Sequence, residues 1–462
     1  MTLIASVSGI RGTIGGEVKN NLTPVDIVAF ASAYGSWLTS STNAKCTVVV
    51  GRDARISGNM VQQLVQQTLV GLGINVIDVG LSTTPTVEME VVRQQAQGGI
   101  ILTASHNPKQ WNALKLLNNK GEFISKADGE ALMQQLKAQS YDFASVDNLG
   151  TITAVDDALE AHIDAILALG LVDVDAIKAA QFSAVVDGVN SSGGVAVPML
   201  LEKLGVKTTK IHCRPNGDFP HNPEPLKEHL TDLIDAVLDY DAHLGIAVDP
   251  DVDRLVFMDE KGVLFGEEYT LVACADYVLQ HQKGSVVSNL SSSRALVDLA
   301  QQHGVKYHAS AVGEVHVVEK MKAVNAIIGG EGNGGVILPE LHYGRDALVG
   351  TALFLSFLAK QNISVSELKK NYSNYVMAKQ KIELSQDWDA DALLAHLTKS
   401  FVNERITTID GVKIDFEDSW IHLRKSNTEP IIRLYAEAAD ENRIHQQVEK
   451  IESAIAAFVA SI

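Results

Sequence analysis

The chain has 462 residues, 46% of them hydrophobic, and 38 basic against 56 acidic side chains give it a net charge of −18. This length predicts roughly three or four domains, and the acidic balance argues against nucleic acid or anionic membranes as partners. No apolar stretch has the ~20 residues of a membrane helix. No secretory signal is visible, and three widely spaced cysteines match no metal or redox motif. The sequence therefore predicts a cytoplasmic globular protein.

A strand–turn–helix–strand pattern occurs three times along the chain. Each copy has a Val-rich strand, a turn rich in Gly, Ser or Arg, an amphipathic helix, and a glycine suited to the left-handed position that closes a helix. The copies cover residues 46–80, 182–213 and 284–313, and their closing glycines are Gly73, Gly205 and Gly304. Buried strands joined by a helix are typical of β-α-β crossovers. We therefore expect three related α/β domains in tandem.

In the first domain an apolar run ends abruptly in polar residues, GGIILTASHNPKQ, residues 98–110. The run predicts a buried strand, and its Asn-Pro pair predicts a turn or a helix start. Ser105 at the carboxyl end of this strand is suited to act as a nucleophile, because ligands of open α/β sheets bind there. The alternative is that Ser105 only caps a following helix. Arg11 and Lys115 add two cations, each of which could equally be a solvated surface charge.

The second domain ends in an acidic loop, DPDVDR, residues 249–254. Asp249, Asp251 and Asp253 alternate, so on an extended chain their carboxylates point the same way and repel one another unless a cation lies between them. Oxygen ligands without His or Cys predict Mg²⁺, Mn²⁺ or Ca²⁺. Arg254 stands where an EF-hand needs glycine, which excludes that motif, whereas a solvated acidic turn remains an alternative. An open metal position beside Arg254 suits a phosphate.

The third domain contains a glycine-rich loop, GGEGNGG, residues 329–335. Glycines allow a backbone to approach a ligand closely. Glu331 in this loop can accept hydrogen bonds from two sugar hydroxyls, with Asn333 beside it. An ordinary flexible loop explains this stretch equally well when it is taken alone.

The last hundred residues follow a different pattern. Residues 411–438 alternate apolar and polar side chains as antiparallel strands do, and helices are expected at residues 389–401 and 441–459. This pattern predicts an α+β module. One of its turns carries two guanidinium groups and three short donors, which predicts a phosphate clamp. The clamp residues are Arg424, Ser426, Asn427, Thr428 and Arg433.

These patterns divide the chain into four domains. The serine loop lies in residues 1–150, the metal loop in residues 151–255, the sugar loop in residues 256–370 and the phosphate clamp in residues 371–462. Residues 138–160, rich in Asp, Ser and Thr, are expected to connect the first two domains.

The motifs together resemble those of the α-D-phosphohexomutase superfamily. SGIRG, TASHNP, DPDVDR, GEGNGG and RKSNTEP with Arg433 occur in the family's order and span the whole chain. The resemblance implies an α/β fold of three tandem related α/β domains and a C-terminal α+β domain, with the four domains around a central cleft. It further implies that each domain contributes one of these loops to that cleft.

The resemblance also implies a phosphoryl relay through phosphorylated Ser105. Ser105 and the three aspartates would bind Mg²⁺, and a hexosamine or hexose 1,6-bisphosphate would be the activator and intermediate. Arg11, His106, Lys115 and Arg254 would surround the reacting phosphate, and Lys115 and Arg11 are candidate bases. A metal-dependent sugar phosphatase and a non-catalytic sugar-phosphate sensor are the competing interpretations.

Within the superfamily, the details favour the phosphoglucosamine mutase branch. The sugar loop and the segment VGEVHV, residues 312–317, resemble the glucosamine enzymes, whereas phosphomannomutases and phosphoglucomutases usually have a histidine where this chain has Gly335. Glu314 could hold the cationic 2-amino group of glucosamine. Phosphomannomutase or phosphoglucomutase activity is the alternative. We expect a cytoplasmic monomer or homodimer that acts on a small sugar phosphate and binds neither nucleic acid nor membranes.

Overall fold

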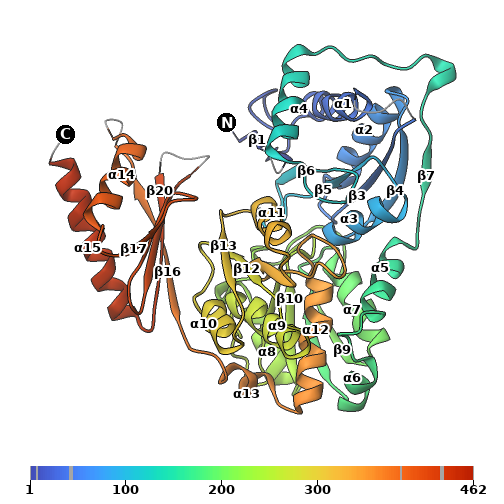
Figure 1. Ribbon diagram of the computed structural model, residues 1–462. Coiled ribbons are helices and arrows are strands. Elements are labelled where there is room, and N and C mark those ends of the chain that lie inside the picture. Colours follow the sequence, from blue (N-terminus) through green and yellow to red (C-terminus); the bar gives the residue numbers. More distant parts are fainter. Residues whose placement is uncertain (1, 7–8, 41–44, 386–387, 427–430, 461–462) are drawn as a thin grey trace. The chain divides into compact units, whose positions relative to one another are not determined.

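The computed structural model describes residues 2–6, 9–40, 45–385, 388–426 and 431–460. The chain forms two compact units (Figure 1). The first unit comprises residues 1–281 and 333–369, and the second comprises residues 282–332 and 370–462. Within the described ranges, no helix is long and apolar enough to cross a membrane.

The first unit begins with a seven-stranded mixed sheet in the order β1-β2-β6-β5-β3-β4-β7. β3 pairs in parallel with β4 and β5, and β4 with β7, whereas β6 pairs antiparallel with both β5 and β2, and β1 with β2. The strands are β1 Ile4–Ser6, β2 Gly9–Thr13, β3 Thr47–Arg52, β4 Asn75–Leu81, β5 Gly98–Leu102, β6 Trp111–Leu117 and β7 Ile152–Ala154. The helices are α1 Pro24–Ser40, α2 Gly58–Gly71, α3 Thr84–Arg93 and α4 Lys126–Ala138.

Apolar side chains on both faces of this sheet explain the near-continuous hydrophobic runs of its central strands. Val48 and Ile100 belong to a core with α1, α2 and α4, whereas Val49 and Ile101 belong to a second core with α3. Figure 1 shows α1, α2 and α4 on one side of the sheet and α3 on the other. Because β3 and β5 are buried on both faces, they give the loops after their carboxyl ends a rigid support.

A four-stranded sheet in the order β11-β10-β8-β9 follows in the first unit. β8 is parallel to β9 and β10, and β11 is antiparallel to β10. The strands are β8 Ser183–Asp187, β9 Lys207–Ile211, β10 Leu244–Val248 and β11 Leu255–Met258. The accompanying elements are α5 Ala158–Leu167, α6 Val174–Ala180, α7 Gly193–Lys203, α8 Thr231–Asp239, α9 Glu267–His281, β15 Gly335–Ile337, α12 Ala347–Gln361 and α13 Val365–Lys369.

The second unit contains parallel strands followed by an antiparallel sheet. β12 (Val286–Asn289) is parallel to both β13 (Tyr307–Ser310) and β14 (Ile328–Glu331), with helices α10 (Ala295–Gln302) and α11 (Glu314–Val324). The antiparallel sheet has the order β16-β20-β19-β18-β17 and a core shared with two helices. Its elements are β16 Val376–Glu383, α14 Ala390–Ser400, β17 Arg405–Thr407, β18 Val412–Asp415, β19 Trp420–Lys425, β20 Ile431–Ala438 and α15 Glu441–Val459.

The predicted β-α-β crossovers are confirmed as β3-α2-β4, β8-α7-β9 and β12-α10-β13, each with parallel strands. The closing glycines Gly73, Gly205 and Gly304 have φ of 80°, 72° and 66°. Residues 138–160, expected to connect the first two domains, also contain β7, which pairs with β4. The three residues of β7 are exposed, so no apolar pattern marks them, and only their backbone pairing makes them a strand.

Candidate active site

Ser105 lies in the loop between β5 and β6, at the carboxyl end of the buried strand. The following element is β6, an antiparallel strand, so the alternative in which Ser105 caps a helix is wrong. Its φ of 48° is in the left-handed region, which is uncommon for a residue with a side chain. Ser105 is only 8% exposed, and its hydroxyl donates to Oδ2 of Asp249 at 2.6 Å.

A buried arginine that the sequence interpretation missed organises this loop. The guanidinium of Arg55 donates to four backbone carbonyls at 2.5 to 3.0 Å, those of Ser105, Asn107, Pro108 and Trp111. Its Nε donates to Asp53, which also accepts from the hydroxyl of Thr103. Arg55 is 1% exposed and comes from the turn after β3. A lone arginine in that turn was the only sequence signal, and its contacts about fifty residues away were not visible.

The three aspartates of the acidic loop converge as predicted. All three are fully buried, and their ligand oxygens lie within 4.8 Å of one another. The reason given from the sequence was wrong, because the residues form a tight turn between β10 and β11 and not an extended chain. Val252 has φ of 64° in that turn, an unusual conformation for a β-branched residue. Thr84 donates to the Asp251 carboxylate from its hydroxyl and to the Asp251 carbonyl from its N–H, and so ties the turn to the first sheet.

The aspartate triad has oxygens suited to a cation. Lys115 donates to Oδ2 of Asp251 at 2.6 Å and to Oδ2 of Asp253 at 3.2 Å, and Arg345 donates to the latter oxygen at 2.7 Å. The Oδ1 atoms of Asp251 and Asp253 are buried and have no hydrogen-bond partner among the described residues. These two oxygens are therefore available to a cation. Because the triad offers only carboxylate oxygens and no nitrogen or sulfur ligand, it fits Mg²⁺.

The pKa values of the triad are pulled in opposite directions. Burial first, and then the charges of Asp253 and Asp251, raise the pKa of Asp249 well above its usual range. Burial would also raise the pKa of Asp253, but Arg345, Lys115 and Arg254 lower it well below its usual range. Burial and mutual repulsion thus disfavour the charged form of Asp249, and a divalent cation among the three carboxylates would offset that cost.

Cations surround the serine. His106 Nδ1 lies 3.4 Å from the Ser105 hydroxyl, and burial followed by the charge of Arg254 lowers the pKa of His106 well below its usual value. Arg11 lowers the same pKa, which places its charge near the imidazole. Arg254 is 9% exposed and pairs with Glu224 at 3.2 Å. The first unit therefore has His106 beside Ser105, and Lys115 and Arg345 on the triad that Ser105 contacts. The roles of Arg11, His106, Lys115 and Arg254 around a reacting phosphate stay a prediction.

The sugar-loop residues Glu331 and Glu314 lie together in the second unit. Oε1 of Glu331 accepts from Asn289 Nδ2 at 2.7 Å and from the N–H of Gly313 at 3.0 Å. Glu314 follows Gly313 as the first residue of α11, and both carboxylates are buried. Asn333 belongs to the first unit, and its buried Oδ1 has no hydrogen-bond partner within the described part of the chain.

Arg345 occupies the space beside Gly335. A Cβ at position 335 would come within 2.3 Å of Cδ of Arg345. A side chain at position 335 would therefore collide with Arg345 unless that arginine moved.

The residues expected to form a phosphate clamp include Arg424 of β19 and Arg433 of β20, in the second unit. Arg424 and Arg433 are direct partners in the antiparallel pair, so their side chains share one face of the sheet. Like charges opposite each other are unfavourable there, and an anion between them would compensate both. Asp410 pairs with Nε of Arg424 at 3.4 Å. Ser426 follows β19, whereas Asn427 and Thr428 lie outside the described residues.

Comparison with known proteins places a family match on each part of the chain. Residues 3–142, 160–262 and 266–375 match the phosphoglucomutase/phosphomannomutase α/β/α domains I, II and III, and residues 367–454 match the C-terminal domain of that family. A phosphoglucomutase/phosphomannomutase of Thermococcus kodakarensis is 35% identical over 446 residues, covering 96% of each chain. A probable phosphoglucosamine mutase of Methanopyrus kandleri is 30% identical, covering 95% of this chain and 94% of that protein.

The fold also has a counterpart among solved structures. The crystal structure of a phosphoglucomutase/phosphomannomutase family protein from Burkholderia thailandensis superposes with a TM-score of 0.84. The two chains are 24% identical, and the match covers 98% of each.

Proposed function

This chain belongs to the phosphoglucomutase/phosphomannomutase family of phosphohexomutases, and we propose that it interconverts glucosamine 6-phosphate and glucosamine 1-phosphate in the cytoplasm. The observation that carries the proposal is the position of Ser105, whose buried hydroxyl contacts Asp249 of the triad on a loop that Arg55 holds in place. A serine fixed beside three carboxylates and several cations suits reversible transfer of a phosphoryl group.

In the proposed relay, phosphorylated Ser105 gives its phosphoryl group to a free hydroxyl of the sugar monophosphate. The P–O bond to the serine breaks, a P–O bond to the sugar forms, and the proton of the sugar hydroxyl passes to the serine oxygen that leaves. Burial would lower the pKa of Lys115, but Asp251 and Asp253 raise it well above its usual value, so Lys115, like the guanidinium of Arg11, is a charged donor to the phosphate and a poor candidate for the base. The sugar bisphosphate then turns over, and its other phosphate returns to Ser105 as the isomeric monophosphate leaves. Mg²⁺ bound by the aspartate triad and the phosphoserine would neutralise charge on the transferring group.

Both orientations of the bisphosphate need a site for the phosphate that is not reacting. The side-by-side guanidinium groups of Arg424 and Arg433 support this role, and Ser426, Asn427 and Thr428 complete the proposed clamp. Glu331 would bind adjacent sugar hydroxyls in either orientation, with Asn333 beside it. Externally supplied hexose or hexosamine 1,6-bisphosphate would phosphorylate Ser105 and so activate the enzyme.

The preference for an amino sugar rests on Glu314. Its carboxylate is 7% exposed and adjoins the residue that donates to Glu331. A carboxylate in this place can pair with a protonated 2-amino group, which glucose and mannose phosphates lack. The absence of a histidine at Gly335 agrees with the same preference.

The test compares kcat/KM on glucosamine, glucose and mannose phosphates, with sugar bisphosphate as activator. We expect the glucosamine substrate to be favoured, and Glu314→Gln to reduce that preference by about tenfold to a hundredfold, since each 1.4 kcal/mol is a factor of ten. Glu319→Gln, an exposed residue of the same helix, is the matched control. Equal or better efficiency on mannose phosphate would favour a phosphomannomutase or phosphoglucomutase instead.

A metal-dependent sugar phosphatase with the same serine and triad is the second candidate. It would have to admit water to the phosphoserine, whereas the separate clamp and sugar loop favour retention of a bisphosphate. Release of inorganic phosphate in step with substrate loss would support the phosphatase, and phosphate retained on the sugar supports the mutase.

A further inference from the structure

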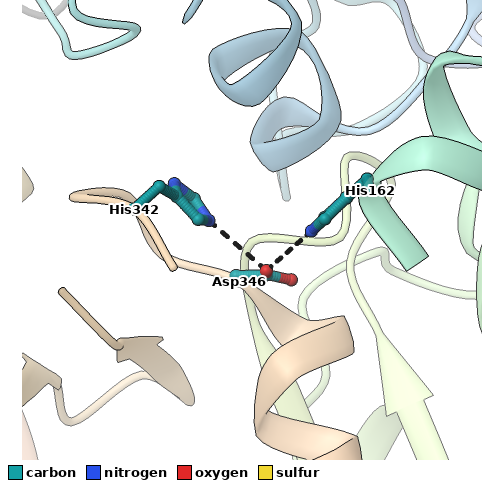
Figure 2. Close-up of side chains that lie close together, drawn as sticks. All are labelled: His162, His342 and Asp346. Atoms are coloured by element: carbon teal, nitrogen blue, oxygen red, sulfur yellow. Dashed lines mark hydrogen bonds and ion pairs between the residues drawn. The ribbon is translucent and has the colours of Figure 1, made fainter. Parts of the chain in front are cut away.

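A second cluster of metal-ligating side chains lies in the first unit (Figure 2). His162 of α5, His342 in the segment after β15 and Asp346 before α12 each contribute one ligand atom, and these atoms lie within 4.8 Å of one another. Nε2 of His162 is 2.9 Å, and Nε2 of His342 is 3.3 Å, from the same oxygen, Oδ2 of Asp346. Two segments about 180 residues apart in sequence, α5 and the stretch between β15 and α12, therefore direct three donor atoms to a common point.

The other polar atoms of these side chains are held from outside the cluster. Nδ1 of His162 lies 2.9 Å from the hydroxyl of Thr86, and Nδ1 of His342 lies 3.4 Å from Oε2 of Glu88. Oδ1 of Asp346 accepts from two backbone N–H groups at the start of α12. Such outer contacts, above all a carboxylate behind a histidine, fix the ring orientation of metal-binding imidazoles.

The charge of the cluster favours a cation. Asp346 and Glu88 are 0% and 1% exposed, so two carboxylates are buried beside His342. A divalent ion bound between the imidazoles and Asp346 would balance the charge of both carboxylates.

We propose that His162, His342 and Asp346 bind a divalent transition-metal ion such as Zn²⁺, at a site separate from the aspartate triad. Two imidazoles and one carboxylate suit zinc, whereas the all-oxygen triad suits magnesium. The side chains of His162 and Asp346 are 1% and 0% exposed, and that of His342 is 11% exposed. A water molecule on the His342 side can complete the coordination shell.

Such an ion would be structural, and it would hold in place a segment that contacts the aspartate triad. It would join α5 to the stretch between β15 and α12. Glu88 of α3 would support it through its contact with His342. Arg345 precedes Asp346 and donates to Asp253 of the triad. Fixing Asp346 would therefore also fix the backbone from which Arg345 reaches the triad.

The test measures zinc in the full-length protein. Chelator-stripped protein is dialysed against Zn²⁺ in mildly alkaline buffer with excess Mg²⁺, which fills the triad, and bound metal is measured by mass spectrometry. We expect the wild type to bind about one zinc ion per chain more than His342→Gln does, a difference that any zinc held by the cluster of Asp187, His212 and His221 leaves unchanged. Asp251→Asn should keep its zinc, because it alters only the triad, and His281→Gln controls for loss of a histidine elsewhere in the first unit. Bound Co²⁺ should give visible absorption that His342→Gln lacks.

A milder variant keeps the proposal testable if His342→Gln does not fold. Thr86→Val removes only the hydroxyl behind His162, and it should weaken zinc binding by roughly 10- to 100-fold. A wild type that takes up no zinc would overturn the proposal, and so would equal zinc content in the wild type and both cluster variants. A lower melting temperature of His342→Gln without any effect of zinc on the wild type would instead identify a proton-bridged network.

Discussion

Ser105 combines a left-handed backbone with a hydroxyl that contacts the triad. Ser105→Ala removes one hydrogen bond, worth about 1 kcal/mol, so the variant should fold while mutase turnover is abolished. Intact mass after incubation with sugar bisphosphate should show one added phosphate on the wild type and none on the variant. Ser145→Ala, at an exposed position, should behave as the wild type. An active Ser105→Ala enzyme would contradict the covalent relay.

Asp251 is the triad member that Lys115 and Thr84 both hold, while its Oδ1 faces no donor among the described residues. Asp251→Asn removes one of the charges that bind the metal, so the Mg²⁺ concentration for half-maximal activity should rise at least about tenfold, a change of 1.4 kcal/mol. Chelation should abolish wild-type activity, and added Mg²⁺ should restore it. Asp235→Asn, an exposed control, should leave the Mg²⁺ dependence unchanged. Activity that survives chelation would mean that the acidic loop is only structural.

At the residue scale, candidate site residues could be predicted from the sequence where they lie together in a short motif. Ser105 and the three aspartates are of this kind. Arg55 and Arg345 were missed because each acts across a long sequence separation, on carbonyls or a carboxylate that no local pattern connects to it. A residue whose role depends only on tertiary contacts produces no local motif or periodic pattern in the sequence.

At the scale of elements, the serine loop depends on one side chain for its shape. Arg55→Lys keeps the charge, but a single ammonium group cannot donate to four carbonyls arranged around a planar fork. We expect kcat to fall by about a hundredfold, because a displacement of 1 Å at a reacting group can cost that much. Arg52→Lys, which alters the neighbouring partly buried arginine, should have a far smaller effect. Equal losses in the two variants would show that Arg55 has no special role in the loop.

Strands β19 and β20 bring the like charges of Arg424 and Arg433 together. Mutation of Arg424 should affect phosphate binding without much effect on stability. Arg424→Ala removes a charge-assisted phosphate contact of about 1.5–3 kcal/mol, so KM should rise about 10- to 150-fold with little change in melting temperature. Arg443→Ala removes an arginine of α15 that pairs with Asp418, and serves as the control. An unchanged KM in Arg424→Ala would place the clamp elsewhere.

Element by element, regular strands and helices were easier to predict than the turns that join them. The helices α14 and α15 lie within one residue of their expected bounds, because an apolar stripe of helical period defines them. The turn at Asp249–Asp253 was expected to be extended, and it is not. Its shape depends on the positive φ of Val252, which intrinsic preferences of valine disfavour and only the surrounding contacts impose.

At the scale of the whole molecule, the repeated crossovers made the domain classes predictable, whereas the division into two units was not. Gly332 ends the second unit's first segment and Asn333 resumes the first unit, so the boundary falls inside one glycine-rich motif. The division into compact units depends on contacts between segments that are distant in sequence, and these contacts cannot be inferred from the composition along the chain.

His422 joins two parts of the second unit, and its titration should be visible in the stability of that unit. It is fully buried, with Nδ1 2.9 Å from the Ser291 hydroxyl and Nε2 2.6 Å from the carbonyl of Asp410. Burial above all, together with the charges of Lys413 and Arg424, lowers its pKa to about 4, although the Asp410 carbonyl and carboxylate oppose this shift. Between about pH 6.5 and 4, His422 therefore binds a proton in the unfolded chain but not in the folded chain.

The free energy of unfolding should accordingly fall as the pH drops from about 6.5 to 4, by at most about 3 kcal/mol from this group, and should not change through it at higher pH. Chemical denaturation across that range measures the effect. His422→Gln, although less stable at neutral pH, should show a shallower decline. A parallel decline in both proteins would assign the acid sensitivity to other groups.

The positive φ values of Ser105 and Val252 have a consequence for anyone engineering this protein for heat resistance. Replacing residues of left-handed conformation by glycine is a routine way to relieve backbone strain, and such a survey would select both positions. One is the proposed nucleophile, and the other shapes the turn of the three aspartates. A library built on that rule would thus trade turnover for melting temperature at these two positions, so both should be withheld from it.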